Sequence, residues 1–315
     1  MRIATVLVLL ALVADGSGYG QKAPPVRKTQ QKPVETEVKA ASESAGRLMK
    51  DVIYNELHDW KDHSFWEYRS HVVTGSKNVL REQIDTPDGP VYEILARDGK
   101  PLEGAQATQE KERLASLLSD PGEIQKKEQE HASDEARLGQ IMALMPKAYV
   151  FHYVGATTGD HVVLKFGPNP QFSPSGYLDR IMYGLSGQIV VNQRLKRMVS
   201  MDGLLAHKIE FGFGILGYVD PGGTFRIHRT QVSPTHWKTD LVAVNVHGRI
   251  LLFSNVSKRE KETRWGFTPV PHNITLAEAD TELKQAASAY QASRQTLTDV
   301  EVDGETALAS DGSGH

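Results

Sequence analysis

Apolar residues alternate with glycine or polar residues between positions 208 and 215. Successive side chains of a strand point to opposite faces, so one face would carry four apolar side chains, those of Ile209, Phe211, Phe213 and Ile215. The opposite face would carry Gly212 and Gly214. Bulk on one face with none on the other is typical of a tightly bending sheet or of a closely approached backbone. We therefore expect a curved antiparallel sheet with an apolar concave side.

Similar patterns, separated by turn residues, predict about ten strands in the chain. The expected strands cover 65–74, 77–85, 90–97, 148–154, 161–166, 194–201, 204–216, 241–246, 249–253 and 263–269. Four short segments predict tight turns because Asp, Pro and Gly favour them: Asp98-Gly99, Asp202-Gly203, Pro221-Gly222-Gly223 and His247-Gly248. Residues 188–256 thus read as an antiparallel β-meander.

Helical spacing predicts a first helix over 44–60, with one buried stripe formed by Met49, Ile53, Leu57 and Trp60. A polar helical region follows over about 106–145, restarted at Asp120, where Asp caps and Pro opens the second part. The capping box Thr275-Leu-Ala-Glu278 predicts a last helix that ends near Gln291. These elements define the α+β class, dominated by antiparallel sheet.

The ends of the chain differ in composition from its middle. Residues 1–20 resemble a signal peptide, with a positive start and an apolar run of about twelve residues, shorter than the ~20 of a membrane-spanning helix. Residues 21–41 predict a disordered linker, and residues 294–315 a disordered acidic tail. We expect an exported, periplasmic protein with one domain over 42–293 and a helical insertion at about 106–145. An uncleaved membrane anchor is the alternative for the first segment.

Composition and motifs narrow the function classes. The chain has no cysteine and a formal net charge of −3, which argues against disulfides, thiolate metal sites and nucleic acid as the partner. Gly-x-Ser-x-Gly, the phosphate-binding glycine loop and His-Glu-x-x-His are all missing from the sequence. The twelve histidines are scattered. We therefore name no catalytic, cofactor-binding or metal-binding residue and predict a protein without enzymatic activity.

Two apolar segments leave alternatives open. Trp66 lies in an aromatic cluster with Trp60, Phe65 and Tyr68, which would either guard the mouth of a cavity or pin the first helix onto the first strand. The loop 166–176 is rich in Pro and contains Phe172. It leads into a helical segment with apolar spacing at Leu178, Ile181, Met182 and Leu185. This segment would be either a lid over the sheet or part of its core.

Several motifs resemble those of a known family. They are Tyr92-Glu-Ile-Leu-Ala-Arg-Asp-Gly-Lys-Pro-Leu102 before a charged helix, Phe166-x-Pro-Asn-Pro-x-Phe-x-Pro174, Gly187-Gln-Ile-Val-Val and the segment 217–225. Over about 45–290 the chain is similar to an uncharacterised family of exported bacterial proteins, which in turn resembles the periplasmic lipoprotein carriers and sigma-factor regulators of the LolA/LolB and RseB types. The resemblance implies a half-open β-barrel with helices on its concave side, where acyl chains bind.

Together, the pattern and the resemblance predict a soluble binding protein for an apolar ligand, a lipid or the acyl chain of a lipoprotein. The candidate ligand-binding residues are Trp66, Phe172, Leu178, Met182, Leu185, Ile209, Phe211, Phe213 and Ile215. The mature chain would have no transmembrane segment. One alternative is a regulatory or scaffolding envelope protein that binds another protein without carrying cargo. A hydrolase with dispersed catalytic residues is the other.

Overall fold

The computed structural model describes residues 44–59, 64–156, 159–211, 217–250 and 253–309, which group into two compact units. Unit 1 contains the described residues before Asp62 together with Ser133–Glu260, and unit 2 contains those of His63–Ala132 together with the residues after Glu260. Each unit is thus built from two separate segments of the chain, whereas one domain is expected from the sequence. The expected signal peptide and linker, residues 1–41, lie outside the described residues.

The α+β class is confirmed, because the described residues form five helices and a curved, open antiparallel sheet of thirteen strands. The elements of unit 1 are α2 (Ala45–Asp59), α4 (Pro121–Ala148, from Ser133 onward), β5 (Tyr149–Ala156), β6 (His161–Pro168), α5 (Tyr177–Gly184), β7 (Leu185–Asn192), β8 (Arg197–Leu205), β9 (Ile209–Phe211), β10 (Gly217–Val219), β11 (Thr224–Gln231), β12 (Trp237–Ile250) and the first part of β13 (Phe253–Val270).

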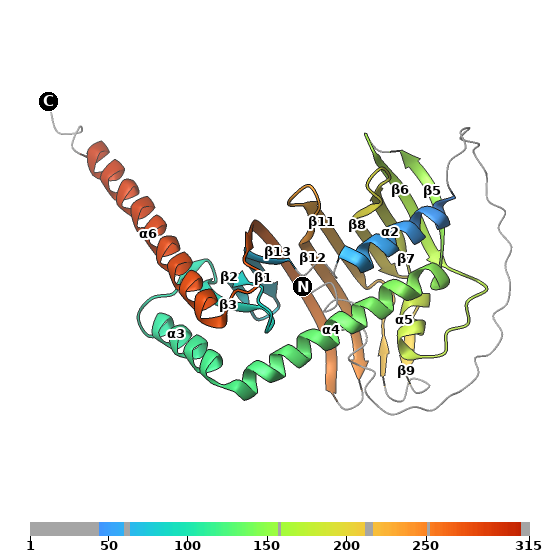
Figure 1. The fold of residues 1–315 in the computed structure, drawn as a ribbon, viewed down its shortest axis with the longest axis horizontal. Coiled ribbons are helices and arrows are strands. Elements are labelled where there is room, and N and C mark those ends of the chain that lie inside the picture. The colour runs from blue at the N-terminus through green and yellow to red at the C-terminus, as the bar shows by residue number, and fades with distance from the viewer. Residues whose placement is uncertain (1–43, 60–63, 157–158, 212–216, 251–252, 310–315) are drawn as a thin grey trace. The chain divides into compact units, whose positions relative to one another are not determined.

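In unit 1 the strands pair antiparallel in the order β12-β11-β8-β7-β6-β5, and β10 joins β12 to β9. The helices α2, α4 and α5 lie on one face of these strands (Figure 1). That face and the helices bury a large apolar core, which includes Ile53, Ile141, Leu164, Met182 and Ile189. The solvent-facing positions of β8 and β11 are polar or exposed, as expected for an antiparallel sheet with one covered face.

A buried glutamate fixes α2 to the sheet of unit 1. Glu56 accepts a hydrogen bond from the backbone N–H of Met198 (3.0 Å) and pairs with Arg229 and, at 3.5 Å, with Arg197. Burial lowers the pKa of Arg229 to about 10, so the guanidinium group stays charged at neutral pH. The apolar stripe expected for the first helix is confirmed for Met49 and Ile53, which are buried in the same core, and for Leu57, which packs against it; Trp60 lies outside the described residues.

Unit 2 contains β1 (Phe65–Thr74), β2 (Asn78–Ile84), β3 (Val91–Arg97), β4 (Lys100–Pro101), α3 (Gly104–Ser119), the first part of α4, the last part of β13 and α6 (Leu276–Ala309). Its strands pair in the order β4-β3-β2-β1. The helices α3 and α6 pack against β3 (Figure 1). A small apolar core lies beneath them, formed by Ile84, Val91, Leu114, Leu117, Ile274, Ala279 and Leu283.

Predictions that rest on local chemistry are confirmed. Asp98 and Gly99 have positive φ angles and join β3 to β4. Thr275 and Glu278 form the expected capping box, with hydrogen bonds of 2.8–3.2 Å in both directions. Asp120 caps the start of α4 through the backbone N–H of Gly122, at 2.8 Å. In each case the interacting groups are at most three residues apart, so the sequence contains the whole signal.

Two turn predictions are wrong for one shared reason. Asp202-Gly203 lies inside β8 and His247-Gly248 lies inside β12, where the strands continue without a turn. A Cβ atom at Gly203 would overlap the ring of Phe225, and a Cβ atom at Gly248 would overlap the backbone of Tyr218. These glycines therefore allow a neighbouring group to approach the strand closely, a role that glycine has in sheets as well as in turns.

The last helix also differs from expectation. α6 continues to Ala309, whereas the sequence predicts a helix ending near Gln291 and a disordered tail from 294. Residues 292–309 contain no proline and a single glycine, Gly304, and eight of the eighteen are Ala, Leu, Gln or Glu. Such a composition favours helix propagation, because these residues lose little conformational freedom in a helix.

Candidate functional site

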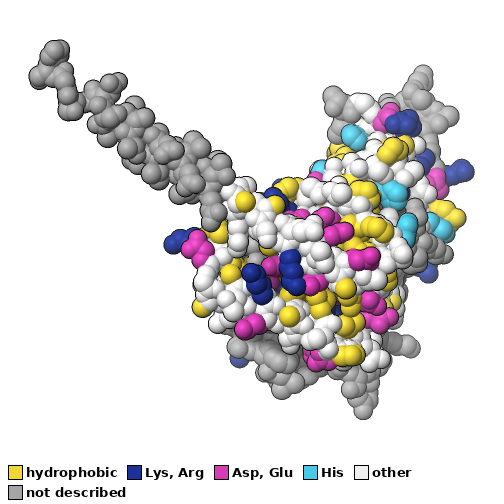
Figure 2. Space-filling view, turned by 60° about the vertical axis from the view of Figure 1, so that its left-hand side comes forward, with side chains coloured by type: hydrophobic (Ala, Val, Ile, Leu, Met, Phe, Trp, Pro, Cys, Tyr) yellow, Lys and Arg dark blue, Asp and Glu magenta, His cyan; other side chains and the backbone are white. Residues whose placement is uncertain are grey.

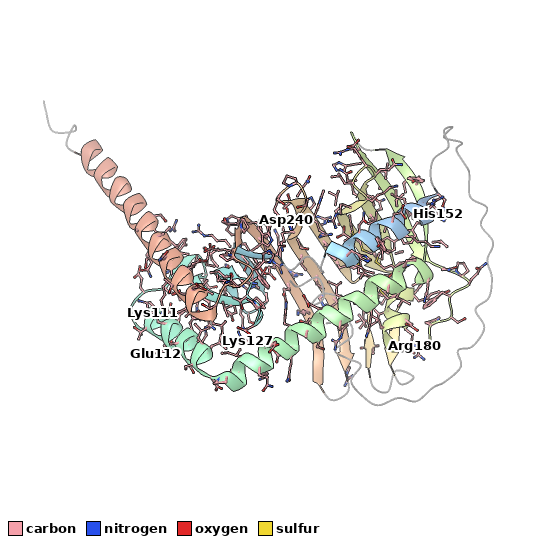
Figure 3. All side chains as sticks on the ribbon, in the orientation of Figure 1. Lys111, Glu112, Lys127, His152, Arg180 and Asp240 are labelled. Carbon is pink, nitrogen blue, oxygen red and sulfur yellow. The ribbon has the colours of Figure 1, made fainter. Side chains whose placement is uncertain are left out.

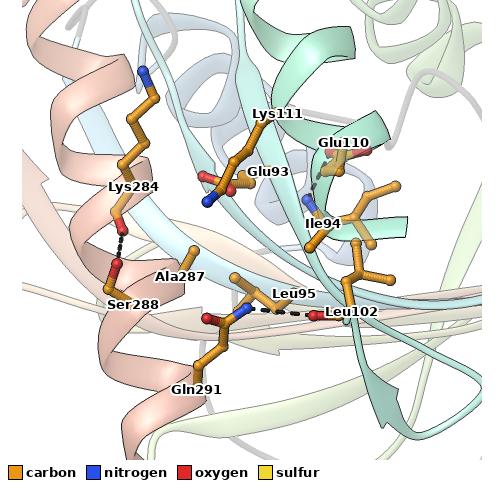
Figure 4. A pocket seen from close by; sticks show the side chains of 11 residues that line it. Glu93, Ile94, Leu95, Leu102, Glu110, Lys111, Lys284, Ala287, Ser288 and Gln291 are labelled. Carbon is orange, nitrogen blue, oxygen red and sulfur yellow. Dashed lines mark hydrogen bonds between the residues drawn. The ribbon is translucent and has the colours of Figure 1, made fainter. Parts of the chain in front are cut away.

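A cavity of about 230 Å³ lies in unit 2, between β3, α3 and α6 (Figure 4). Its lining residues are Glu93, Ile94, Leu95, Leu102, Ala107, Glu110, Lys111, Lys284, Ala287, Ser288 and Gln291. Apolar side chains form much of the wall, while carboxylate, ammonium, hydroxyl and amide groups occupy separate positions around it. Apolar walls with a few placed polar groups are typical of small-molecule binding sites.

The strand β3 places a carboxyl group on an otherwise apolar face. Val91, Glu93 and Leu95 are buried and lie two residues apart, so they share the face that α3 and α6 cover. The intervening Tyr92 and Ile94 are half-buried on the other face. A strand that is covered by helices usually carries apolar residues on its inner face, and the acidic residue at position 93 therefore departs from the pattern.

Glu93 is the feature that distinguishes this cavity. Only 5% of the residue is exposed, and its Oε2 atom has no hydrogen-bond partner. Burial and then the charge of Glu110 raise the pKa of the Glu93 carboxyl group above its ordinary value. Leaving a buried polar atom unsatisfied is costly, so such an atom calls for an explanation.

Glu110, the second carboxylate, is already fully engaged. It accepts hydrogen bonds from Arg113 at 2.6 and 2.9 Å and from the backbone N–H of Ile94 at 2.9 Å. Arg113 also donates to the carbonyl oxygen of Tyr92 at 2.8 Å, and its guanidinium group lies 4.6 Å from the centre of the Tyr92 ring. These contacts join α3 to β3 and hold one wall of the cavity in place.

Two lysines stand beside the cavity in different situations. Lys284 on α6 pairs with Asp280 at 2.6 Å, one turn earlier on the same helix. Lys111 on α3 extends toward the Glu93 carboxyl group (Figure 4). The far wall is held by hydrogen bonds from Ser288 to the Lys284 carbonyl oxygen (2.8 Å) and from Gln291 to the Leu102 carbonyl oxygen (3.4 Å). Lys111 is therefore the basic side chain that faces Glu93.

The predicted apolar ligand residues are found in two different units. Met182, Leu185 and Ile209 belong to the core of unit 1, where the protein's own side chains bury them. Phe172 and Leu178 are half-buried and pack against that same core.

Trp66 is separate from this group, because it is buried in unit 2 and donates a hydrogen bond from its Nε1 atom to Ser64 at 2.9 Å. The side chain of Phe211, together with Phe213 and Ile215, lies outside the described residues. Five of the nine candidates are thus brought together, as core and core-edge side chains.

Sequence reasoning missed Glu93, Lys111 and Lys284. One signal was available for Glu93, since an acidic residue stood two positions from apolar residues on both sides within a predicted strand. Lys111 gave none, because the polar helical region 106–145 was expected to be partly solvated and contains many charged residues. Lys284 gave none either, because it is one of several charged residues in the last predicted helix. On the face shown in Figure 2, acidic and basic side chains are interspersed with hydrophobic ones rather than separated by sign.

A second polar cluster lies on the outer face of unit 1. His228 on β11 is 2.6 Å from Asp240 on β12, and Ser200 on β8 is the cross-strand partner of His228. These residue types form catalytic triads elsewhere, but a nucleophile requires its hydroxyl group to be hydrogen-bonded to the imidazole. The hydrogen bond of His228 goes to Asp240, and the side chain is 43% exposed. We therefore interpret this cluster as a cross-strand hydrogen-bonded pair at the surface.

Comparisons with known proteins add no relationship: no family model, no curated protein and no solved structure matches this chain. Among the described residues, no group of three or more His, Asp or Glu side chains is placed to hold a metal ion. The helices within the described ranges also include none whose length and apolar character would let it cross a membrane.

Proposed function

We propose that this chain is a binding protein whose ligand is a small molecule held in the cavity of unit 2. The observation that carries the proposal is the buried carboxyl group of Glu93, which lines the cavity and whose Oε2 atom lacks a hydrogen-bond partner. A ligand with a donor group would bind this carboxyl group. Burial of the ligand against Leu95, Leu102 and Ala287 would add apolar contact.

Binding is favoured over catalysis by how the carboxylates are used. Acid–base catalysis requires a titratable group within hydrogen-bond reach of the reacting proton, commonly with a second group that serves the opposite role. Glu110 is committed to Arg113 and to the backbone of Ile94, so only Glu93 among the lining carboxyl groups is available to a ligand.

The size of the cavity bears on the earlier hypothesis of an acyl-chain carrier. Sites for drug-sized ligands occupy roughly 300–1,000 Å³, so a cavity of about 230 Å³ suits a smaller molecule. Acyl-chain binding in unit 1 would require that helices leave the sheet, since Met182 on α5 is buried in one core with Leu185 on β7 and Ile209 on β9. We keep export and a carrier-like arrangement of the unit 1 sheet as parts of the proposal that rest on the resemblance alone.

A ligand screen with a matched pair of variants tests the proposal. The purified protein is screened against a library of small metabolites by thermal shift and ligand-observed NMR. Ala287→Phe fills the cavity, whereas Ala289→Phe places the same ring on an exposed position of the same helix. We expect hits that bind the native protein and Ala289→Phe but not Ala287→Phe. Hits that bind both variants equally, or a library without any binder, would contradict the proposal.

The carrier hypothesis has its own test. The protein is purified without detergent, extracted with organic solvent, and the extract is analysed by mass spectrometry. We expect no stoichiometric lipid, because the described apolar side chains of unit 1 are buried by one another. One acyl chain per protein molecule would instead favour a lipid carrier and would move the ligand site to unit 1.

A further inference from the structure

We infer that the ligand of the unit 2 cavity is a small zwitterion, namely an α-amino acid with an apolar side chain. Its ammonium group would bind Glu93, and its carboxylate would bind Lys111. This inference rests on the proposed function and adds the chemical class of the ligand. It follows from the opposite charges of two lining residues, which come from different elements and face each other across one small space (Figure 4).

The ammonium group of the ligand would supply the hydrogen-bond donors that Glu93 lacks. An ionised carboxylate only accepts hydrogen bonds, and an ammonium group has three donors that would bind the Glu93 carboxylate from the cavity. Charge-assisted hydrogen bonds of this type are shorter and stronger than neutral ones. A ligand with acceptors alone would leave the ionised carboxylate unsatisfied and repelled.

The carboxylate of the ligand is assigned to Lys111 rather than Lys284. Lys284 is already paired with Asp280, whereas the side chain of Lys111 extends toward Glu93. A simple amine would satisfy Glu93 but would be repelled by Lys111. A molecule that carries both charges on neighbouring atoms meets both residues at once.

The remaining walls suit an apolar side chain of limited size. Leu95, Leu102, Ala107 and Ala287 supply apolar surface. A volume of about 230 Å³ is below the range of about 300–1,000 Å³ for drug-sized ligands, which favours a molecule with the size of a single amino acid. Both the charges and the volume therefore point to the same class of ligand.

The pH dependence of binding distinguishes an ammonium ligand from an acceptor. The charged groups around Glu93 are Glu110 and Lys111 on α3, Asp280 and Lys284 on α6, and Glu82 on β2, which is the cross-strand partner of Glu93. An ammonium ligand requires ionised Glu93, so its affinity should increase as the pH rises through the pKa of this group. An acceptor ligand would bind protonated Glu93 and show the reverse trend.

The test uses three related probes in isothermal titration calorimetry: L-leucine, 4-methylpentanoate without the amine, and 3-methylbutylamine without the carboxylate. We expect L-leucine to bind at least about tenfold more tightly than either, because each lost partner removes a hydrogen bond to a charged group. Glu93→Gln should weaken L-leucine by about tenfold and should not weaken 4-methylpentanoate, because it removes a like charge from the site. Lys111→Gln should weaken L-leucine and 4-methylpentanoate but not the amine.

Glu112→Gln is the matched control, since Glu112 is the exposed neighbour of Lys111 on α3 and does not line the cavity (Figure 3). It should leave all three affinities unchanged. Circular dichroism and Tm confirm that each variant is folded. Equal binding of the three probes, or L-leucine binding that Glu93→Gln does not change, would overturn the inference. If L-leucine fails while other metabolites bind in a manner sensitive to Ala287→Phe, the ligand class is wrong and the proposed function stands.

Discussion

Units 1 and 2 bury similar charged networks beside apolar cores of different size. Unit 1 has a large apolar core, and its buried Glu56 pairs with Arg197 and Arg229. Unit 2 has a smaller apolar core and buries an Arg-Glu-Arg network, in which Glu262 contacts Arg81 at 2.9 Å and Arg264 at 3.0 Å.

Buried side-chain atoms without a hydrogen-bond partner occur in both units, for example at Asn245 in unit 1 and at Glu93 and Asp280 in unit 2. Among these three residues, Glu93 is the one that lines the cavity of unit 2. The cavity lies in the unit with the smaller apolar core. The same comparison predicts that the two units respond to different kinds of mutation.

The largest effect is expected at the charged network of unit 2. Glu262 is 1% exposed, so Glu262→Gln would leave two buried guanidinium groups without their anion. Breaking a buried pair from one side costs about 3–5 kcal/mol of unfolding free energy. Urea denaturation measures the change. The exposed control Glu128→Gln should stay within about 0.5 kcal/mol of the native protein. A similar small effect of Glu262→Gln would contradict the importance of the network.

In unit 1 the sensitive position is apolar. Leu164 on β6 is fully buried, and Leu164→Ala should lower the unfolding free energy by about 2–5 kcal/mol through lost burial and a residual cavity. Leu204, which is 45% exposed on β8, provides the matched control, and Leu204→Ala should have a much smaller effect. Equal losses for the two variants would show that unit 1 is not stabilised by close packing.

A third test addresses the glycine at position 203. Gly203→Ala would force a methyl group into the ring of Phe225, and overpacking of this kind costs about 1–3 kcal/mol. Combination with Phe225→Leu should give less than the sum of the two single losses, because the clash is removed. Gly155→Ala on β5, where a Cβ atom would have nothing within 4 Å, should be tolerated. Additive losses in the double variant would exclude the clash.

The smallest effect concerns pH and Glu93. Burial and Glu110 raise the pKa of Glu93 in the folded state, so its contribution to stability is present below the unfolded pKa and is lost as the pH rises through the folded pKa. The Glu93→Gln side chain does not ionise, so the variant does not lose this stability as the pH rises. The ligand-free variant should therefore gain up to about 1 kcal/mol at neutral pH and gain nothing at about pH 4. Tm measured across this pH range checks the prediction, and an unchanged difference across the range would contradict it.

The sequence predicted the features whose chemistry is local. The capping box at Thr275 and the turn at Asp98-Gly99 depend on neighbouring residues, and both are present. Gly203 and Gly248 were misinterpreted because their roles depend on Phe225 and Tyr218, on other strands. A glycine that permits close packing and a glycine that permits a turn have the same appearance in a single sequence.

The candidate site could not be predicted because its walls are distant in the chain. Gln291 on α6 donates to the carbonyl oxygen of Leu102, although 189 residues separate them. The packing of α3 and α6 against β3 can be recognised only in the folded structure. The same holds for the absence of a hydrogen-bond partner at the Oε2 atom of Glu93. The apolar alternation at 208–215 instead predicted a ligand surface in unit 1, where Ile209 is a core residue.

The interleaving of the two units along the chain has a consequence for synthesis. The first segment of unit 2 is complete by Ala132, but its partner segment begins only at Lys261, after all of unit 1 has been made. Domains generally fold as units while the ribosome extends the chain. Here β1, β2 and β3 leave the ribosome long before α6 is made. A chaperone would therefore have to protect these strands until translation ends and α6 can cover them.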